Sequence, residues 1–299
     1  MTWTRLPLAR AAVDRGAERR AEPKLVSDLL ADPRTRVLLV RHGAVAMRGG
    51  VALNLLGPGE LGEHTADLGR WLYLGTEDGV GYLAAVIRDD ADARSSDWAT
   101  LRDVGAALSD RDAGLATMAV GLAAWHRSLV HCPHCGAELV VEDSGWLLRC
   151  PVDASPHYPR TDPAVIMAVL DASDRLLLAR ASRWSQRRFS TVAGFVEPGE
   201  SAEQAVRREV AEETGVIVGE VTYLGSQPWP FPGSLMLAFR ASAVTTPITV
   251  DGVELTEARW FSRAELAADI QAGLVAMPSR ASIARVMIED WFGGALPGE

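Results

Sequence analysis

The part of the sequence that most constrains the fold is residues 194–216, which read GFVEPGESAEQAVRREVAEETGV. This stretch predicts a tight turn at its Gly and Pro residues, followed by a short helix. Ser201 can cap the start of the helix, and Gln204, three residues later, completes a capping-box pattern. Gly215 can end the helix, because glycine adopts the left-handed conformation of a helix C-terminus without steric cost.

The predicted helix has an unusual distribution of charge. At about 100° per residue, Glu209, Glu212 and Glu213 share one arc that adjoins the apolar positions, with Arg207 and Arg208 expected on the other side. A helix stabilised by burial alone places its acids opposite the apolar stripe, and like charges three or four residues apart repel. Divalent cations that take oxygen ligands, Mg²⁺ or Mn²⁺, would convert this repulsion into binding. A solvated acidic helix is the alternative, and the residues upstream argue against it.

Those upstream residues make a family resemblance visible. Gly194, then Glu200, then the string REVAEETGV at residues 208–216 resembles the Nudix box at every position. The resemblance implies an α/β/α Nudix sandwich and metal-dependent hydrolysis of a nucleoside diphosphate linked to another group. It also implies that Arg208 braces Glu200.

Composition limits the other possibilities. A length of 299 residues suggests two domains, or one large domain with an addition. No apolar segment approaches the ~18 residues of a membrane helix, and the charged N-terminus lacks the apolar core of a signal peptide, so we expect a cytoplasmic protein without a membrane partner. The net charge of −9 argues against a protein that coats nucleic acid. Lys24 is the only lysine, so any phosphate clamp depends on Arg, backbone N–H groups or metal.

All three cysteines lie in one short stretch. Cys132 and Cys135 form a C-x₂-C pair and Cys150 follows, which is typical of part of a zinc ribbon with a structural Zn²⁺. Asp153 stands where a fourth Cys is expected, and the spacing favours it as the fourth ligand. A nitrogen ligand from a nearby histidine is a second possibility, and a site without metal is a third. The candidate histidines are His131, His134 and His157.

The chain divides into three predicted parts. Residues 1–127 carry no motif, and we expect a small α+β domain that supports dimerisation or covers the active site. Residues 128–160 form the zinc-ribbon-like segment, and residues 161–299 form the Nudix domain. Strands are predicted at 37–47, 70–75, 79–87, 164–170, 175–180, 188–194, 219–225, 234–243 and 259–262, and further helices at 112–129, 262–273 and 278–292. The expected fold class is therefore α/β (α+β).

The segment SQPWPFPGS at residues 226–234 is the second informative stretch. Its three prolines exclude a central strand and predict a rigid bend. Such a bend presents Trp229 and Phe231 for stacking on a flat heterocycle, although a packed structural turn would look the same in sequence.

The order of these features identifies a narrower resemblance. The ribbon, then Tyr158-Pro159-Arg160, then the Nudix box, then SQPWPFP resembles the NADH pyrophosphatase (NudC-type) subfamily over roughly residues 125–292. This resemblance implies hydrolysis of the pyrophosphate bond of NADH or NAD⁺ to nicotinamide mononucleotide and AMP. It further implies removal of NAD caps from RNA 5′ ends and a homodimer.

The resemblance also implies a set of site residues. Metal ligands would be Glu209, Glu213, Glu254 and the backbone of Ala193, and the general base would be Glu212 or Glu254. Substrate contacts would be Tyr158, Gln227, Pro228, Trp229, Pro230, Phe231, Pro232, Gly233, Ser234 and Ala284. Two positions depart from the family: Gly233 replaces the usual Gln, and Gly145 stands where some relatives carry an acid.

Two other functions compete with this hypothesis. A Nudix hydrolase acting on ADP-ribose, a nucleotide sugar or an oxidised nucleotide is disfavoured by SQPWPFP. A zinc-ribbon module that binds nucleic acid beside an inactive Nudix scaffold is disfavoured by the intact acidic string.

Overall fold

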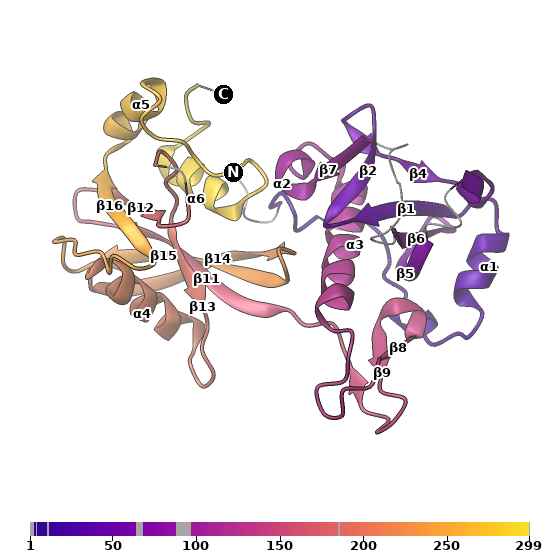
Figure 1. The fold of residues 1–299 in the computed structure, drawn as a ribbon. Helices are drawn as coiled ribbons and strands as arrows, with labels where there is room; N and C mark the ends of the chain where they lie inside the picture. The colour runs from indigo at the N-terminus through magenta and orange to yellow at the C-terminus, as the bar shows by residue number, and fades with distance from the viewer. Residues whose placement is uncertain are drawn as a thin grey trace. The chain divides into compact units, whose positions relative to one another are not determined.

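The computed structural model describes residues 3, 5–10, 12–63, 68–87, 97–184 and 186–298 (Figure 1). The chain forms two compact units. The first unit consists of Met1–Pro7, Asp162–Gln227 and Ser234–Glu299, and the second of Leu8–Thr161 and Pro228–Gly233. Within the described residues, no helix combines the length and the apolar character that crossing a bilayer requires.

A mixed sheet forms the centre of the first unit. Its strand order is β14-β15-β11-β12-β16, and the short strand β13 pairs with β11. β11 runs parallel to β15 and antiparallel to β12 and β13. The strands are β11 (Asp162–Leu170), β12 (Leu176–Ala181), β13 (Val192–Phe195), β14 (Val218–Trp229), β15 (Ser234–Ala243) and β16 (Leu255–Phe261).

Helices cover both faces of this sheet. Side chains alternate along β11, so Val165, Met167 and Val169 pack with the helix α4 (Ala202–Thr214), while Ile166 and Ala168 belong to a second core. That second core contains α5 (Arg263–Gln271) and α6 (Ile283–Phe292). The α/β/α sandwich predicted from the sequence is therefore confirmed.

One strand is longer than predicted. β14 continues beyond residue 225 and includes Gln227, Pro228 and Trp229. It lies at the edge of the sheet, where a proline without an N–H group is tolerated. The expectation that the SQPWPFPGS segment is bent throughout was therefore wrong for its first half, and the turn is confined to residues 230–233.

The second unit contains a sheet of the order β3-β2-β1-β6-β5, with β4 paired to β1 and β7 paired to β2. The single strand predicted at 37–47 is a hairpin that turns at His42 and Gly43, both with positive φ. The strands are β1 (Arg36–Arg41), β2 (Ala44–Arg48), β3 (Ala52–Leu53), β4 (Leu55–Leu56), β5 (Leu68–Glu77), β6 (Val80–Ile87) and β7 (Asp97–Thr100). The α-helices are α1 (Leu25–Ala31), α2 (Leu101–Val104) and α3 (Asp110–Ser128).

A small three-stranded sheet completes the second unit. It contains β8 (Val140–Glu142), β9 (Leu147–Arg149) and β10 (Pro156–His157), and it carries the cysteines. The indole N–H of Trp146 donates to the Tyr73 carbonyl at 2.8 Å, and the Arg20 guanidinium lies 3.5 Å from the centre of the Trp146 ring. Gly145 has φ of 94°, and an added Cβ would lie 2.8 Å from the Trp71 carbonyl oxygen. Close packing therefore requires glycine at this position.

Candidate active site

The start and end of α4 are formed as the sequence predicts. The Ser201 hydroxyl accepts a hydrogen bond from the Gln204 backbone N–H, and the Gln204 side chain accepts one from the Ser201 N–H. Gly215 ends the helix with φ of 71°. Both predicted caps are therefore confirmed, and they define where each acidic side chain lies on the helix.

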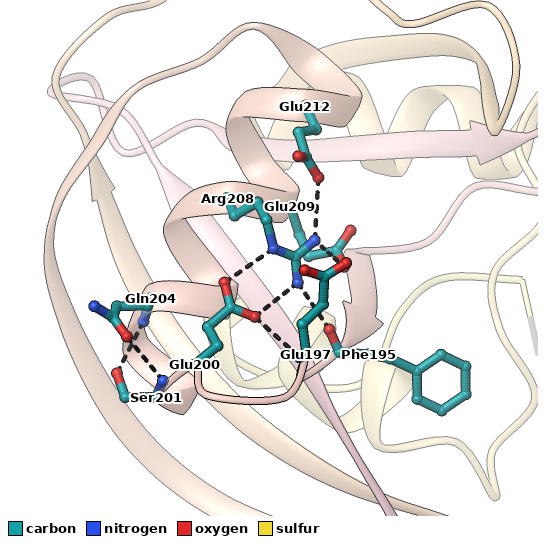
Figure 2. A network of polar contacts seen from close by, with 8 residues as sticks. All are labelled: Phe195, Glu197, Glu200, Ser201, Gln204, Arg208, Glu209 and Glu212. Atoms are coloured by element: carbon teal, nitrogen blue, oxygen red, sulfur yellow. Dashed lines mark hydrogen bonds and ion pairs between the residues drawn. The ribbon is translucent and has the colours of Figure 1, made fainter.

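Arg208 is the centre of the polar network on this helix (Figure 2). Its Nε and Nη2 each donate to one oxygen of Glu200 at 2.9 Å. Nη1 donates to Glu209 at 2.8 Å and to Glu212 at 3.1 Å, and Nη2 also donates to the Phe195 carbonyl at 2.9 Å. These contacts use all five N–H groups that a guanidinium possesses.

The expectation that Arg208 lies away from the acids was wrong for its guanidinium. The Cα position is as predicted, but the long side chain extends along the helix surface and reaches Glu209 and Glu212. Arg208 also lowers the pKa of Glu200, whose carboxylate accepts the Glu197 N–H at 3.1 Å. The turn before α4 is thereby tied to the helix, which agrees with the bracing role expected from the resemblance.

The three helix acids differ in exposure. The Glu212 side chain is 61% exposed, the Glu209 side chain is 12% exposed, and Glu213 is only 6% exposed. The Glu209 carboxylate packs against Gly194, and a Cβ at Gly194 would overlap it. The glycine that opens the Nudix box therefore leaves the space that this carboxylate occupies, and a larger residue would force the carboxylate to move.

Burial and mutual repulsion change the acidity of these groups. The pKa of Glu213 is raised to about 8, first by burial and then by the charges of Glu209, Glu254 and Asp251. Burial also raises the pKa of Glu209, and Arg208 opposes this effect only in part. Acids in such an environment are stabilised by an added cation.

Glu213 and Glu254 line the same cavity, of about 400 Å³. Ala193 also contributes to its wall, so three of the four predicted metal ligands meet here. The loop that carries Glu254 is held by Asp251, whose carboxylate accepts the backbone N–H groups of Glu254 and Leu255, both at 2.9 Å. Carboxylate and carbonyl oxygens around one cavity, one of them on an acid whose pKa is raised, fit a hard divalent cation such as Mg²⁺ or Mn²⁺.

The predicted substrate contacts are spread over several elements. Gln227 is fully buried and its Nε2 donates to the Ala281 carbonyl at 3.0 Å, while Ala284 is 2% exposed in the α6 core. Tyr158 is 63% exposed. Ser234 opens β15, and Gly233 packs near the Arg160 carbonyl. Their contact with a substrate stays a prediction.

The aromatic pair of the SQPWPFP segment has a partner that the sequence did not suggest. The rings of Trp229 and Phe231 meet edge to face at 4.9 Å. The Arg102 guanidinium lies 5.0 Å from the centre of the Trp229 ring and 4.4 Å from that of Phe231. Arg102 is on α2, far away in the chain, so no local pattern could have indicated this contact.

The cysteine cluster is already assembled. The sulfur atoms of Cys132, Cys135 and Cys150 and a carboxylate oxygen of Asp153 all lie within 4.8 Å of one another. Asp153 accepts from the Ser155 backbone and hydroxyl at 2.9 and 2.6 Å, which lowers its pKa. This cluster contains none of the three candidate histidines, although His134 Nδ1 is 3.4 Å from Asp153.

The cluster chemistry suits a zinc ion. Burial raises the pKa of Cys132, but hydrogen bonds with the backbone N–H groups of His134 and Cys135 and with the side chains of Ser155 and His157 together bring the pKa to about 6. Burial raises the pKa of Cys150 to about 11, so a cation would be needed to ionise that thiol. Three sulfur ligands and one carboxylate oxygen form an acceptable tetrahedral set for Zn²⁺.

Two family profiles match the chain. The profile described as NUDIX domain matches residues 160–281, and the one described as NADH pyrophosphatase-like rudimentary NUDIX domain matches residues 34–125. Together with the fold and the acidic helix, they define the protein as a Nudix hydrolase. The second match also shows that the N-terminal region, which carries no motif of its own, is Nudix-like.

Similar proteins narrow the assignment. The chain is 38% identical over 279 residues to NAD-capped RNA hydrolase NudC of Mycobacterium bovis, covering 88% of this chain and 85% of that protein. It is 37% identical over 279 residues to the protein of the same name from Mycobacterium tuberculosis, with the same coverage. It is 42% identical over 197 residues to human NAD-capped RNA hydrolase NUDT12, covering 62% of this chain and 42% of that protein. The chain belongs to the NudC family of Nudix hydrolases.

Proposed function

We propose that this protein hydrolyses the pyrophosphate bond of NADH or NAD⁺, giving nicotinamide mononucleotide and AMP, and that it removes NAD caps from RNA 5′ ends. The observation that carries the proposal is the meeting of Glu213, Glu254 and Ala193 at one cavity, beside a helix whose acids are organised by Arg208. Family membership supports the choice of a dinucleotide as substrate. The similarity to NAD-capped RNA hydrolases supports the RNA cap as a second substrate.

The residues around the cavity have separate tasks. Glu209, Glu213, Glu254 and the Ala193 carbonyl would hold the divalent cation, Mg²⁺ or Mn²⁺. When bound, that cation neutralises the diphosphate and lowers the pKa of water. The ionisation of Glu213 depends most strongly on this cation, because a pKa of about 8 keeps the acid largely protonated near neutral pH when no cation is bound.

Two carboxylates are candidates for the general base. Glu212 is exposed and accepts a hydrogen bond from Arg208 at 3.1 Å, which holds its oxygen in place. Glu254 lies at the cavity wall on a loop fixed by Asp251. The position of Glu254 at the wall favours it as the base.

The remaining assignments rest on the resemblance and on local geometry. Trp229 and Phe231 would stack against a base of the dinucleotide, with Tyr158 and residues 227–234 as further contacts and Ala284 lining the pocket. Zn²⁺ would occupy the cysteine cluster with Asp153 as its fourth ligand. The protein would act as a homodimer in the cytoplasm.

Product analysis tests the proposal directly. Purified protein is incubated with Mg²⁺ or Mn²⁺ and, in parallel, with NADH, NAD⁺, ADP-ribose and NAD-capped RNA. We expect nicotinamide mononucleotide and AMP from the dinucleotides, and RNA with a 5′ monophosphate from the capped substrate. A higher kcat/KM for ADP-ribose than for NADH would instead support a hydrolase of other nucleoside diphosphates. Inert protein that still binds RNA in a gel would support a binding module.

A further inference from the structure

The loop between β12 and β13 is unusually basic for this acidic protein. Residues 180–190 read RASRWSQRRFS, with Arg183, Arg187 and Arg188 surrounding Trp184. The net charge of the chain is −9 and it contains a single lysine, so this concentration of arginine is not an average property of the surface. Ser185 lies outside the described residues.

The loop lies at the proposed active site. Ser182, Arg183 and Trp184 line the same cavity as Glu213 and Glu254. The Ser182 backbone N–H donates to the Glu254 carbonyl at 2.8 Å, which ties the start of the loop to a predicted metal ligand.

The far end of the loop is also fixed by backbone hydrogen bonds. The Ala276 N–H donates to the Arg187 carbonyl at 2.7 Å, and the Phe189 N–H donates to the Ala276 carbonyl at 3.0 Å. The arginines are therefore presented from a loop that is held at both ends.

Within the described part of the first unit, no carboxylate neutralises the charges of these arginines. Most other arginines of the first unit contact a carboxylate at nitrogen–oxygen distances between 2.6 and 3.2 Å: Arg175, Arg180, Arg208, Arg240, Arg259, Arg263 and Arg285. Among the residues that the structure describes, Arg183, Arg187 and Arg188 form no ion pair. Arg188 stacks on Trp184, with its guanidinium 4.7 Å from the ring centre, while Arg183 and Arg187 are exposed.

Free NAD does not account for this many cations. A dinucleotide carries two phosphates, and both belong to the bond that a cation on the glutamates would address. Further guanidinium groups beside the cavity match an additional phosphate, which a capped RNA supplies in the first phosphodiester after the cap. Arginines interleaved with an aromatic ring are typical of sites for single-stranded RNA, whose phosphates pair with the cations and whose bases stack.

We propose that Arg183 and Arg187 bind the phosphodiesters that follow the NAD cap, so that this loop selects capped RNA over the free dinucleotide. The inference rests on the proposed function, because it assumes that the cavity holds the cap. Arg188 stacks on Trp184 in the same loop, which leaves the exposed Arg183 and Arg187 as the proposed phosphate contacts. A local contact of this kind is compatible with the acidic net charge, which excludes only a broad RNA-binding surface.

The test compares two double variants with the same change in charge. Arg183→Gln with Arg187→Gln removes the proposed contacts. Arg240→Gln with Arg259→Gln removes two arginines that pair with Asp290 and Asp269 and do not line the cavity. Because Arg183 also lines the cavity, the comparison is between substrates: we expect the loop variant to lower kcat/KM for NAD-capped RNA about tenfold more than kcat/KM for NAD⁺, since the proposed phosphodiester contacts lie outside the dinucleotide. The control variant should change neither value.

A binding measurement separates this inference from the proposed function. RNA of the same sequence with a 5′ hydroxyl contains no pyrophosphate bond to hydrolyse, and its affinity can be followed by fluorescence anisotropy at several salt concentrations. The loop variant should bind it more weakly, with a slope of log K against log salt that is less steep by about 1.4, or 0.7 for each lost phosphate contact. This result would stand even if the wild type failed to hydrolyse NAD⁺.

Two results would overturn the inference. An equal loss of kcat/KM on NAD⁺ and on capped RNA would show that the guanidinium groups contact the dinucleotide itself. Unchanged RNA turnover together with an unchanged salt slope would show that the loop is an ordinary solvated surface.

Discussion

The two sheets of this protein share one pattern of strand pairing. The central strand is β1 in one unit and β11 in the other, and each runs parallel to a later strand, β6 or β15. Each is also antiparallel to the next long strand, β2 or β12, and to a short strand, β4 or β13. β2 pairs with β7, and β12 pairs with β16. A helix follows directly after each of these partners, α2 after β7 and α5 after β16. The rudimentary Nudix match at the N-terminus therefore has a topological basis.

The difference lies in one connection. Residues 196–217 join β13 to β14 and include the acidic helix α4. The corresponding residues 57–67 join β4 to β5 and are half as long, with a 3₁₀ helix at Pro58–Glu63 in their described part. The Glu60 carboxylate there accepts the Gly57 N–H at 2.6 Å and so serves as a local cap. The comparison teaches that the sheet is a scaffold and that the acids of α4 depend on one longer connection.

Burial shifts the pKa of one ionisable group in each unit towards the neutral form, but the surroundings of the two groups differ. Glu213 on α4 has its pKa raised to about 8, and His126 on α3 has its pKa lowered to about 4, in both cases mainly by burial. Each group is thus moved towards its neutral form. His126 is satisfied by Arg70 Nη1 at 3.0 Å and the Gly145 carbonyl at 2.8 Å, whereas Glu213 faces other acids. His126, whose hydrogen bonds are all made within the protein, therefore has a structural role. Glu213, which is surrounded by other acids, would be stabilised by a bound cation.

The largest expected effect is on turnover. Glu213→Gln should lower kcat for NADH at least about a thousandfold, because a predicted metal ligand is lost. The matched change in the other unit, Glu60→Gln, should leave kcat within twofold. Steady-state kinetics with Mg²⁺ and with Mn²⁺ measure both. Normal kcat in the Glu213 variant would refute its assignment as a metal ligand.

The second prediction concerns stability and pH without metal. Because the folded-state pKa of Glu213 lies above its ordinary value of 4.5, its contribution to stability is fully present below about pH 4.5 and decreases as the pH rises towards 8. Glu213→Gln should therefore gain stability relative to wild type by up to about 1.4 kcal/mol per pH unit between pH 5 and 8.

Chemical denaturation in a magnesium-free buffer measures this difference. His126 acts in the opposite direction between about pH 4 and 6.5, but its contribution is common to both proteins and cancels. Added Mg²⁺ should reverse the ranking. A difference that does not vary with pH would mean that Glu213 is ionised in the free enzyme.

The third prediction concerns the cysteine cluster of the second unit and the identity of its fourth zinc ligand. Asp153→Cys should slow the release of Zn²⁺ to a chelator about tenfold, and Asp153→Ala should accelerate it by a similar factor, because thiolate is the better zinc ligand and alanine is none. His134→Ala is the control. Release that responds to His134 and not to Asp153 would assign the fourth position to nitrogen.

The smallest expected effect is on substrate affinity. Trp229→Ala should raise KM for NADH about tenfold, equivalent to about 1.4 kcal/mol, through loss of a stacking surface. Tyr223→Ala, at an exposed aromatic on the same strand, should leave KM unchanged. Equal KM values for the two variants would restrict the SQPWPFP segment to a structural role.

Much of the acidic site could be predicted because its determinants are local. The capping box, the C-terminal glycine and the helical spacing of the acids depend on residues within one or two turns of each other, and all are found where expected. The cysteine spacing is also a local pattern, and the cluster that it predicted includes Asp153. Sequence patterns of this kind predict local hydrogen bonds, helix geometry and metal-ligand spacing directly.

Other features depend on contacts between distant residues, and only the tertiary structure decided them. The approach of Arg102 to Trp229 and the meeting of Glu254 with Glu213 each join groups that no periodicity relates, and the second was expected only from the family resemblance. The Nudix-like pairing of the second unit was hidden because strand order is set by which apolar faces can pack together, and short buried strands carry almost no signal of their partners. By itself, then, the sequence determined the helix and its chemistry, while packing decided which charges surround it.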